Sequence, residues 1–414
     1  MTTTDNADAP DTAVGRNMID FAADFMPALA AATNVVRAAG RLNGRRVGVA
    51  LTLEPKTACL VEAIASLGAD VAVLGSSNST RPAVAAALRE TGVKVFAERG
   101  SSPERSAELR DGFIDHYPEY LIDDGAFNVR RIHDQRRDAL PSLLGVAEET
   151  TSGVRPLRNM AAAGMLEVPC LAVNDARTKL LFDNVYGTGQ SVVMAILDAT
   201  NLQMQGKVVV VVGYGKVGRG IASMARGLGA RVTVTEIDPV EALAAHHDGL
   251  GVAPLMDALV DADVVITASG IGYSLIADHV AAMKDGAIVA VGGAGPPEFD
   301  PTMLGTLTEP LIWGDTVRDN IQELRVPGGN TVFVIANGHC ANTSAGEGNP
   351  IEVMDLSLAL QMRAIDYLAS NELAVGVHLV PKGVDDQVAS SQLAAAGLAI
   401  DTPSATQIEA ARTW

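Results

Sequence analysis

The chain has 414 residues, more than one hydrophobic core usually accommodates, so we expect two or three domains. A formal net charge of -18 argues against nucleic acid and anionic membranes as partners, because both require a basic face. No apolar run reaches the ~20 residues that span a bilayer, and the first residues do not resemble a signal peptide, which predicts a cytoplasmic protein. The 3 cysteines and 7 histidines show no ligand spacing, so no metal site is predicted.

Residues 1–17 are polar, which predicts disorder. From Arg45 onward, apolar runs at 45–51, 69–75 and 93–98 alternate with helical patterns at 57–68 and 81–92. Strands that alternate with helices form parallel sheets covered on both faces. The first part of the chain is therefore predicted to be a doubly wound α/β domain, and we expect it to bind the substrate.

Residues 208–218 read VVVVVGYGKVG, which is typical of a strand buried on both faces that turns sharply into a helix. In this GxGxxG pattern, Gly213 permits the tight turn, Gly215 lets a pyrophosphate approach the backbone, and Gly218 lets the helix pack on the strand. Glu236 follows close to the spacing of ~20 residues at which a carboxylate binds a ribose 2′-hydroxyl and would repel a 2′-phosphate. The pattern predicts NAD rather than NADP as the cofactor.

The glycine loop and the later strands add further cofactor contacts. Lys216 lies inside the loop, where its ammonium group either pairs with the phosphates or points to solvent, and Val217 follows it. Two more apolar strands, at 262–270 and 286–293, end in glycine, and ligands of doubly wound sheets sit at such carboxyl ends. We therefore expect Ser269 and Gly292 to contact NAD.

A helical pattern returns at 351–368, and an apolar run at 375–380 precedes a short amphipathic tail. This return after the last cofactor strand indicates that one domain is inserted into the other. We predict an α/β fold with two doubly wound Rossmann-like domains and a small C-terminal helical tail. The expected substrate domain spans residues 18–183 and 350–378, the NAD domain 184–349 and the tail 379–414, with the active site in the cleft between the domains.

Polar segments between the two domains carry family motifs. With them the sequence resembles the S-adenosylhomocysteine hydrolases from about Phe25 to about Ala410. The matches are Asp123, Asp124 and Gly125 to the family's DDGG, residues 148–154 to EETTTGV, 178–187 to TKxxFDNxYG, 213–220 to GYGxVGxG, and 235–239 to TEIDP.

The resemblance implies an elimination that depends on a transient oxidation. NAD⁺ oxidises C3′ of a nucleoside, the C4′ proton becomes acidic and is lost, and the group on C5′ leaves. Water normally adds to the alkene before the hydride returns. NAD is thus expected to be bound tightly and regenerated in each turnover.

Four residues are the expected catalytic groups. Lys179 and Asp183 are four residues apart and share one face of a helix, where a desolvated lysine beside a carboxylate could act as a base for an alcohol. Such a pair, taken without the family, is more often a surface salt bridge. The resemblance implies that Glu149 and Asp124 hold ribose hydroxyls and assist proton transfer near C4′ and C5′.

Several further polar residues match family positions that contact NAD, although capping and turn hydrogen bonds would also explain them. They are Thr150, Thr151, Ser152, Asn184 and Asn342.

The sequence departs from the family where the substrate is expected to bind. Thr52 stands where the family has a histidine that acts on the C5′ leaving group, and a hydroxyl cannot exchange protons near pH 7. Glu54 and Lys56 replace a threonine and a glutamate that bind ribose and base. Lys56 suggests a 6-oxo purine or another group with an acceptor, or it fills a surface position.

Other departures affect the nicotinamide site and the gate of the cleft. Thr188 replaces a cysteine beside the nicotinamide, and Asn349 replaces a gate histidine; we expect both residues to contact the substrate. Ala294 and Gly295 replace a histidine and a phenylalanine, which would make room for an altered sugar. The lysine and tyrosine tail that reaches a neighbouring subunit in the family is missing, although a homotetramer or homodimer is still expected.

These departures favour an enzyme that keeps oxidation and elimination but acts on another nucleoside. Our leading hypothesis is an NAD-dependent dehydratase, of the angustmycin type found in nucleoside-antibiotic biosynthesis, in which Asp124 or Glu149 protonates the departing hydroxide. One alternative is ordinary S-adenosylhomocysteine hydrolysis. Another is a catalytically silent NAD-binding regulatory protein, which the intact set of catalytic residues argues against.

Overall fold

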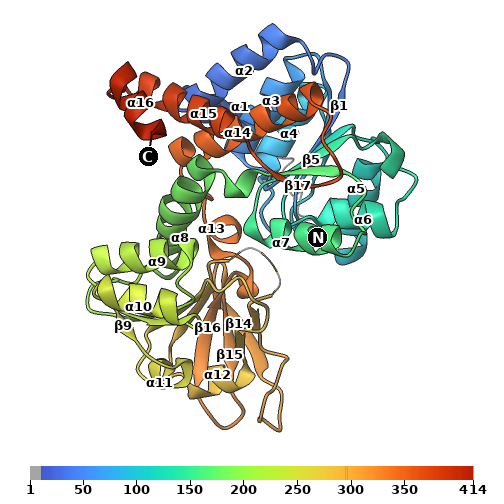
Figure 1. Ribbon diagram of the computed structural model, residues 1–414. Helices are drawn as coiled ribbons and strands as arrows, with labels where there is room; N and C mark the ends of the chain where they lie inside the picture. Colours follow the sequence, from blue (N-terminus) through green and yellow to red (C-terminus); the bar gives the residue numbers. More distant parts are fainter. Residues whose placement is uncertain (1–10, 294, 296, 414) are drawn as a thin grey trace, which may run out of the picture.

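The computed structural model describes residues 11–293, 295 and 297–413 of the chain. They form two α/β domains, and the chain passes from the first into the second and back again (Figure 1). The predicted α/β fold with two doubly wound domains is confirmed.

The first domain is built on a parallel sheet in the order β3-β2-β1-β4-β5-β6-β17. Apolar clusters on both faces of this sheet form its core. Its strands are β1 (Arg46–Ala50), β2 (Asp70–Leu74), β3 (Lys94–Phe96), β4 (Tyr120–Asp123), β5 (Gly145–Glu148), β6 (Pro169–Ala172) and β17 (Gly376–Leu379). Its helices are α1 (Thr12–Asp24), α2 (Pro27–Ala39), α3 (Pro55–Ala65), α4 (Pro82–Glu90), α5 (Pro103–Ile114), α6 (Phe127–Asp134), α7 (Thr151–Ala162), α14 (Ile351–Ser370) and α15 (Lys382–Ala395), with short turns η1 (Leu140–Ser142) and η2 (Val173–Asp175).

The second domain has a sheet in the order β14-β15-β16-β12-β10-β7-β8-β9, in which β14 and β15 are antiparallel to their neighbours. Its strands are β7 (Val208–Val212), β8 (Arg231–Thr235), β9 (Gly251–Val252), β10 (Val264–Thr267), β12 (Ile288–Val291), β14 (Ile312–Arg318), β15 (Ile321–Arg325) and β16 (Thr331–Ile335), and β11 (Leu275–Ile276) pairs with β13 (Phe299–Asp300). Its helices are α8 (Thr188–Thr200), α9 (Lys216–Gly227), α10 (Pro239–His247), α11 (Leu255–Leu259), α12 (Ala277–Ala282) and α13 (Ala341–Ser344), with the turn η4 (Ala336–Gly338).

Both sheets reverse their strand order once, between β1 and β4 in the first domain and between β7 and β10 in the second. At such a point the loops after two neighbouring strands run to opposite faces of the sheet and leave a crevice, where doubly wound proteins bind their ligands. The chain crosses between the domains through the π-helix η3 (Lys179–Gly187) into α8, and returns from α13 into α14 (Figure 1). The predicted boundary at residues 183 and 184 falls inside η3.

The two ends of the described chain differ from expectation. The prediction of disorder is wrong for residues 12–17, which lie in α1, because Asp11 caps that helix by accepting from Ala13 N and Val14 N. Residues 1–10 lie outside the described residues. At the other end, the boundary predicted after residue 378 falls within β17, and α15 packs on α2 and α14. The last helix, α16 (Ala405–Arg412), has no buried residue and projects from the first domain (Figure 1).

Helix α14 joins the first domain by capping another helix as well as by packing. The buried Asp355 accepts hydrogen bonds from Ala28 N at 2.8 Å and Leu29 N at 2.7 Å, and so satisfies two free N–H groups at the start of α2. Within the described residues, no helix taken singly has the length and hydropathy needed to cross a bilayer, while α1 and α2, bent by 85°, pass that test as a pair.

Candidate active site

A cavity of about 430 Å³ lies where the switch points of the two sheets face each other, a size typical of ligand sites. Both domains line it, from Thr52 and Asp124 after strands β1 and β4 to Gly215 and Ser269 after strands β7 and β10. Most of the predicted site residues meet here. The cavity brings together Thr52, Glu54, Asp124, Glu149, Thr150, Thr151, Ser152, Lys179, Asp183, Asn184, Thr188, Gly215, Lys216, Val217, Ser269, Gly292, Asn342 and Asn349.

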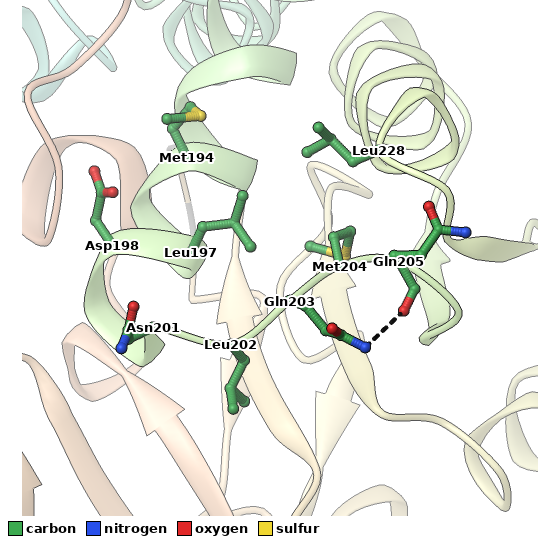
Figure 2. Close-up of a pocket in the computed structure, with 9 residues that line it drawn as sticks. All are labelled: Met194, Leu197, Asp198, Asn201, Leu202, Gln203, Met204, Gln205 and Leu228. Atoms are coloured by element: carbon green, nitrogen blue, oxygen red, sulfur yellow. Dashed lines mark hydrogen bonds between the residues drawn. The ribbon is translucent and has the colours of Figure 1, made fainter.

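A second hollow, of about 570 Å³, opens beside the end of α8 and contains none of the predicted residues. Met194, Leu197 and Leu228 face it, and Asp198 is the ionisable side chain among those drawn in Figure 2. Of the residues that line this hollow, Asp198 could exchange a proton, but none belongs to the glycine loop that would bind a nucleotide. The chemistry therefore belongs to the cavity between the domains.

The predicted lysine and carboxylate pair lies at the centre of that cavity. Lys179 Nζ is 2.8 Å from Asp183 Oδ2 and donates to Asn184 Oδ1 at 2.9 Å. Because η3 is a π-helix, in which residues four and five positions apart stay on one side, a single ammonium group reaches both partners. Lys179 is 4% exposed, so the alternative of a surface salt bridge is wrong.

Lys179 is surrounded by carboxylates. Burial by itself would lower its pKa, but Asp183 and Glu149 outweigh burial, and the net pKa is raised. Glu149 Oε1 lies 3.8 Å from Lys179 Nζ. Lys179 is therefore an ammonium group, and the expectation of a free amine base has to be replaced by an ion pair of Lys179 with Asp183.

Asp124 and Glu149 hold protons more tightly than ordinary carboxyl groups. Burial, and then the negative charge of Glu149, raise the pKa of Asp124 to about 7. Burial also raises the pKa of Glu149, which Lys179 and hydrogen bonds to Ser357 and Gln361 oppose. A carboxyl that titrates near 7 can exchange protons at neutral pH, which suits an acid or a base.

Glu149 accepts hydrogen bonds from two residues that were not predicted from the sequence. Ser357 Oγ donates to Oε1 and Gln361 Nε2 to Oε2, and both residues are fully buried in α14. The signal for them was faint, because a serine and a glutamine four residues apart on the apolar face of a helix are usually read as packing imperfections.

Asp123 and Glu148, the acidic neighbours of Asp124 and Glu149, support the backbone. Glu148 accepts from Gly125 N at 2.8 Å, Ala126 N at 3.0 Å and Thr150 N at 3.1 Å. Asp123 accepts from Asn128 N and Val129 N, both at 3.0 Å, at the start of α6. In each acidic pair, the first carboxylate therefore fixes a loop and the second faces the cavity.

The glycine loop fits a dinucleotide. Gly213 has φ +99°, and a Cβ there would lie 2.8 Å from Ala268 O, while a Cβ on Gly218 would lie 2.1 Å from Gly213 O. A Cβ on Gly215 would meet nothing within 4 Å. The turn is closed on the protein side and open at Gly215, where a pyrophosphate needs room beside the N-terminus of α9.

Glu236 directly follows the last residue of β8 and lies beside this loop. Its carboxylate accepts from Tyr214 N at 2.6 Å and Ile237 N at 2.8 Å, which fixes it next to the glycines. An acid in this place suits a ribose hydroxyl. Lys216 is exposed at the cavity, so both of its predicted roles remain compatible with its position.

Three polar residues that were not predicted complete the cofactor side. Asn174 Oδ1 accepts from Thr151 Oγ1 at 3.1 Å and from Asn184 Nδ2 at 3.2 Å, which joins two expected NAD contacts. Glu298 accepts from Ser269 N and Gly270 N, both at 2.9 Å, and fixes the loop after β10. Cys340 also lines the cavity, with its pKa raised to about 12 by burial, so it is not a thiolate nucleophile.

The residues that depart from the family occupy the substrate side. Glu54 lines the cavity, and Lys56 lies behind it, with Nζ 3.0 Å from Glu54 Oε2 and donating to Glu347 O at 2.9 Å. Lys56 is 5% exposed, so it does not fill a surface position. Ala294 lies outside the described residues, and a Cβ on Gly295 would lie 3.0 Å from Ser152 Cβ. In the part of the chain that the structure describes, no group of three or more histidine, cysteine or acidic side chains could hold a metal ion.

Comparisons with known proteins agree with this geometry. The family model described as "S-adenosyl-L-homocysteine hydrolase, NAD binding domain" matches residues 184–348, and "S-adenosyl-L-homocysteine hydrolase" matches residues 5–143. An S-inosyl-L-homocysteine hydrolase of Methanopyrus kandleri is 43% identical over 97% of this chain and 95% of its own. An adenosylhomocysteinase of Thermotoga maritima is 41% identical over 97% of this chain and 99% of its own. The chain therefore belongs to the S-adenosylhomocysteine hydrolase family of NAD-dependent enzymes.

Proposed function

We propose that the protein removes the substituent on C5′ of a purine nucleoside by oxidation at C3′ and elimination across C4′ and C5′, and that it hydrolyses an S-nucleosyl-L-homocysteine. The observation that carries this proposal is that the buried Lys179, Asp183 and Glu149 share one cavity with the half-buried Asp124 and the glycine loop. Relatives that align with nearly the whole chain are named as hydrolases of such compounds.

NAD⁺, when bound along the glycine loop and Glu236, supplies reversible oxidation at C3′. The charged pair of Lys179 and Asp183 binds the 3′-hydroxyl, and the Asp183 carboxylate takes up its proton. Glu149, whose two oxygens are held by Ser357 and Gln361, removes the proton from C4′. The bond between C5′ and sulfur then breaks, and Asp124, protonated near neutral pH, gives its proton to the departing thiolate. Water then adds to the alkene at C5′ and gives a proton back to Asp124, while Glu149 returns the proton to C4′. Reversal of the oxidation at C3′ restores the hydroxyl and completes the hydrolysis.

The pair of Glu54 and Lys56 supports a 6-oxo purine as the base. A 6-oxo purine presents an acceptor, O6, beside a donor, N1–H, whereas adenine presents the reverse. Glu54 lines the cavity with a carboxylate, an acceptor that suits N1–H of a 6-oxo purine, and Lys56 Nζ holds that carboxylate from behind at 3.0 Å. S-Inosyl-L-homocysteine is therefore the substrate that we propose first, with S-adenosyl-L-homocysteine second.

Dehydration of a nucleoside is the second candidate, because Thr52 occupies the wall where the family has an acid for the leaving group. A site without that histidine is free to act on a 5′-hydroxyl, provided that Asp124 protonates the hydroxide. The product would keep the alkene across C4′ and C5′, as in the antibiotic nucleosides of the angustmycin type.

One experiment separates these candidates. The protein, preincubated with NAD⁺, is mixed separately with S-inosyl-L-homocysteine, S-adenosyl-L-homocysteine, inosine and adenosine. Free thiol and product masses are then followed, with Lys179→Met as the inactive control. Thiol release from either thioether supports hydrolysis, and a loss of ~18 mass units from a nucleoside without net NADH supports dehydration. If the wild type does neither, the proposed chemistry is wrong.

Self-association is a separate proposal. The outer side of η3 carries Leu181, Phe182 and Tyr186, exposed at 41%, 40% and 63%, and the two rings lie 5.8 Å apart. Exposed apolar groups in such a row favour contact with another protein surface, and a second copy would fit the expected homo-oligomer. Sedimentation velocity of the wild type and of Tyr186→Glu tests this: a monomer in both would end the proposal.

A further inference from the structure

Asn349 lies where the two connections between the domains meet. Its Nδ2 donates to Asp183 Oδ1, in η3, and to Thr188 Oγ1 at 3.1 Å, at the start of α8. Its Oδ1 accepts from Ser191 Oγ at 2.7 Å and from Asn342 Nδ2 at 3.0 Å. One amide group thus touches both the outgoing and the returning chain.

These four contacts use the whole hydrogen-bonding capacity of the amide. An asparagine side chain has two N–H donors and one oxygen with two lone pairs. Asn349 spends both donors and both lone pairs on protein partners, so it has none left for a substrate. Asn349 was expected to contact the substrate, but its four protein contacts favour another role.

The amide is also held in place sterically. A Cβ on Gly187 would lie 3.0 Å from Asn349 Nδ2 and 2.9 Å from Val353 Cγ1, so the bare backbone of Gly187 packs on the amide. The N-terminal neighbours of Asn349 are fixed too, since Lys56 Nζ donates to Glu347 O at 2.9 Å and Arg81 Nη2 to Gly346 O at 2.5 Å. The returning chain is therefore tied to the first domain just before Asn349, the residue that contacts Asp183.

The contact with Asp183 is the one that bears on catalysis. Lys179 Nζ holds Oδ2 of this carboxylate at 2.8 Å, and Asn349 holds Oδ1. A hydrogen bond donated to a carboxylate favours its ionised form, and two donors on its two oxygens also fix its plane. An amide cannot titrate, so this support stays constant across neutral pH.

We propose that Asn349 is a positioning residue, which fixes the Asp183 carboxylate against Lys179 from the returning interdomain connection and does not bind substrate. The kinetic part of this inference rests on the proposed function, because Asp183 is taken to act on the 3′-hydroxyl. Its structural part, a direct contact between Asn349 and the Asp183 carboxyl group, does not depend on that function.

Stability measurements test the contact without any substrate. Asn349→Asp keeps the shape of the side chain but places a second carboxylate against Asp183, and two carboxylates in one site retain a proton. Their shared folded pKa is raised, so stability falls as pH rises from the unfolded value of ~3.9 through the raised value. The gap in melting temperature between wild type and variant should therefore widen by several degrees from pH 5 to pH 8.

Matched variants separate this effect from general damage. The other charged groups near this point, Lys179, Glu149, Asp124, Glu54 and Lys56, are present in both proteins, so a pH-dependent gap reports the added carboxylate and its coupling to them. Asn159→Asp makes the same change at an exposed position in α7 and should give a gap that does not depend on pH between pH 5 and pH 8. A constant gap for Asn349→Asp would overturn the proposed contact.

Kinetics test the role. With whichever nucleoside the wild type turns over, Asn349→Asp and Asn349→Ala should lower kcat by about 10-fold to 100-fold and leave KM within about threefold, because a carboxylate displaced by ~1 Å reacts poorly although substrate still binds. Asn349→His, which retains one N–H donor, should recover part of kcat. A raised KM with unchanged kcat would show that Asn349 binds substrate and would overturn the positioning role. A wild type inactive on every nucleoside refutes the proposed function, while the pH-dependent gap still decides the contact.

Discussion

Replacing Asp124 with asparagine should change how the stability of the protein depends on pH. The pKa of Asp124 is raised from 3.8 to about 7, first by burial and then by the charge of Glu149. A carboxyl whose folded pKa lies above its unfolded pKa keeps its proton more tightly in the folded state. The stability that this proton contributes is complete below the unfolded pKa and is lost as pH rises through about 7.

The magnitude follows from the same change. Each pKa unit corresponds to ~1.4 kcal/mol. The titration of Asp124 should therefore lower the unfolding free energy of the wild type by about 4 kcal/mol between pH 4 and pH 8. This is an upper bound, because the residue is half-buried and solvent in the cavity screens part of the effect. Asp124→Asn lacks this titration, so the variant should gain stability relative to the wild type as pH rises.

Urea denaturation at pH 5, 6, 7 and 8 measures the difference in unfolding free energy between the wild type and Asp124→Asn directly. The difference in unfolding free energy should change by ~1–3 kcal/mol across the series. The variant should also lose about 10²-fold to 10⁴-fold in turnover, because an amide cannot protonate a leaving group. Parallel stability curves for the two proteins would refute the proposed titration of Asp124, whatever the kinetics show.

Three further substitutions probe other parts of the structure. Lys179→Met should lower kcat/KM by about 10²-fold to 10⁴-fold while NAD still binds, as checked by calorimetry; loss of NAD binding as well would contradict a role at the sugar. Glu236→Gln should narrow the preference for NAD over NADP, measured as the ratio of their Kd values, and an unchanged ratio would exclude the assigned ribose contact. Asp355→Ala leaves two N–H groups of α2 unpaired and should cost about 1–2 kcal/mol in urea denaturation; an unchanged midpoint would mean that the cap does not stabilise the fold.

The cofactor half of the site was predictable because local sequence determines it. A glycine in the left-handed region, a close approach of helix to strand and an acid at the end of the next strand all leave a fixed pattern. Gly213, Gly218 and Glu236 accordingly lie where the pattern places them.

The catalytic half was predictable only in part, because its geometry comes from distant chain segments. The spacing of Lys179 and Asp183 indicated a shared helix face, but not a π-helix that also brings in Asn184. The two donors on Glu149 come from α14, about two hundred residues along the chain, and no local signal pairs them with it. Disorder was expected through residue 17 because polar composition hides the cap and buried face of α1.

Hydrogen exchange at C4′ of the nucleoside tests the central claim most directly. The protein with NAD⁺ is incubated in D₂O with S-inosyl-L-homocysteine and S-adenosyl-L-homocysteine, and with inosine and adenosine. The recovered nucleosides and products are then examined by NMR and mass spectrometry. Oxidation and elimination predict loss of the H4′ signal and a gain of ~1 mass unit, both absent with Lys179→Met. Cleavage at C5′ with H4′ fully retained would contradict the account, because it would show direct displacement without removal of the C4′ proton.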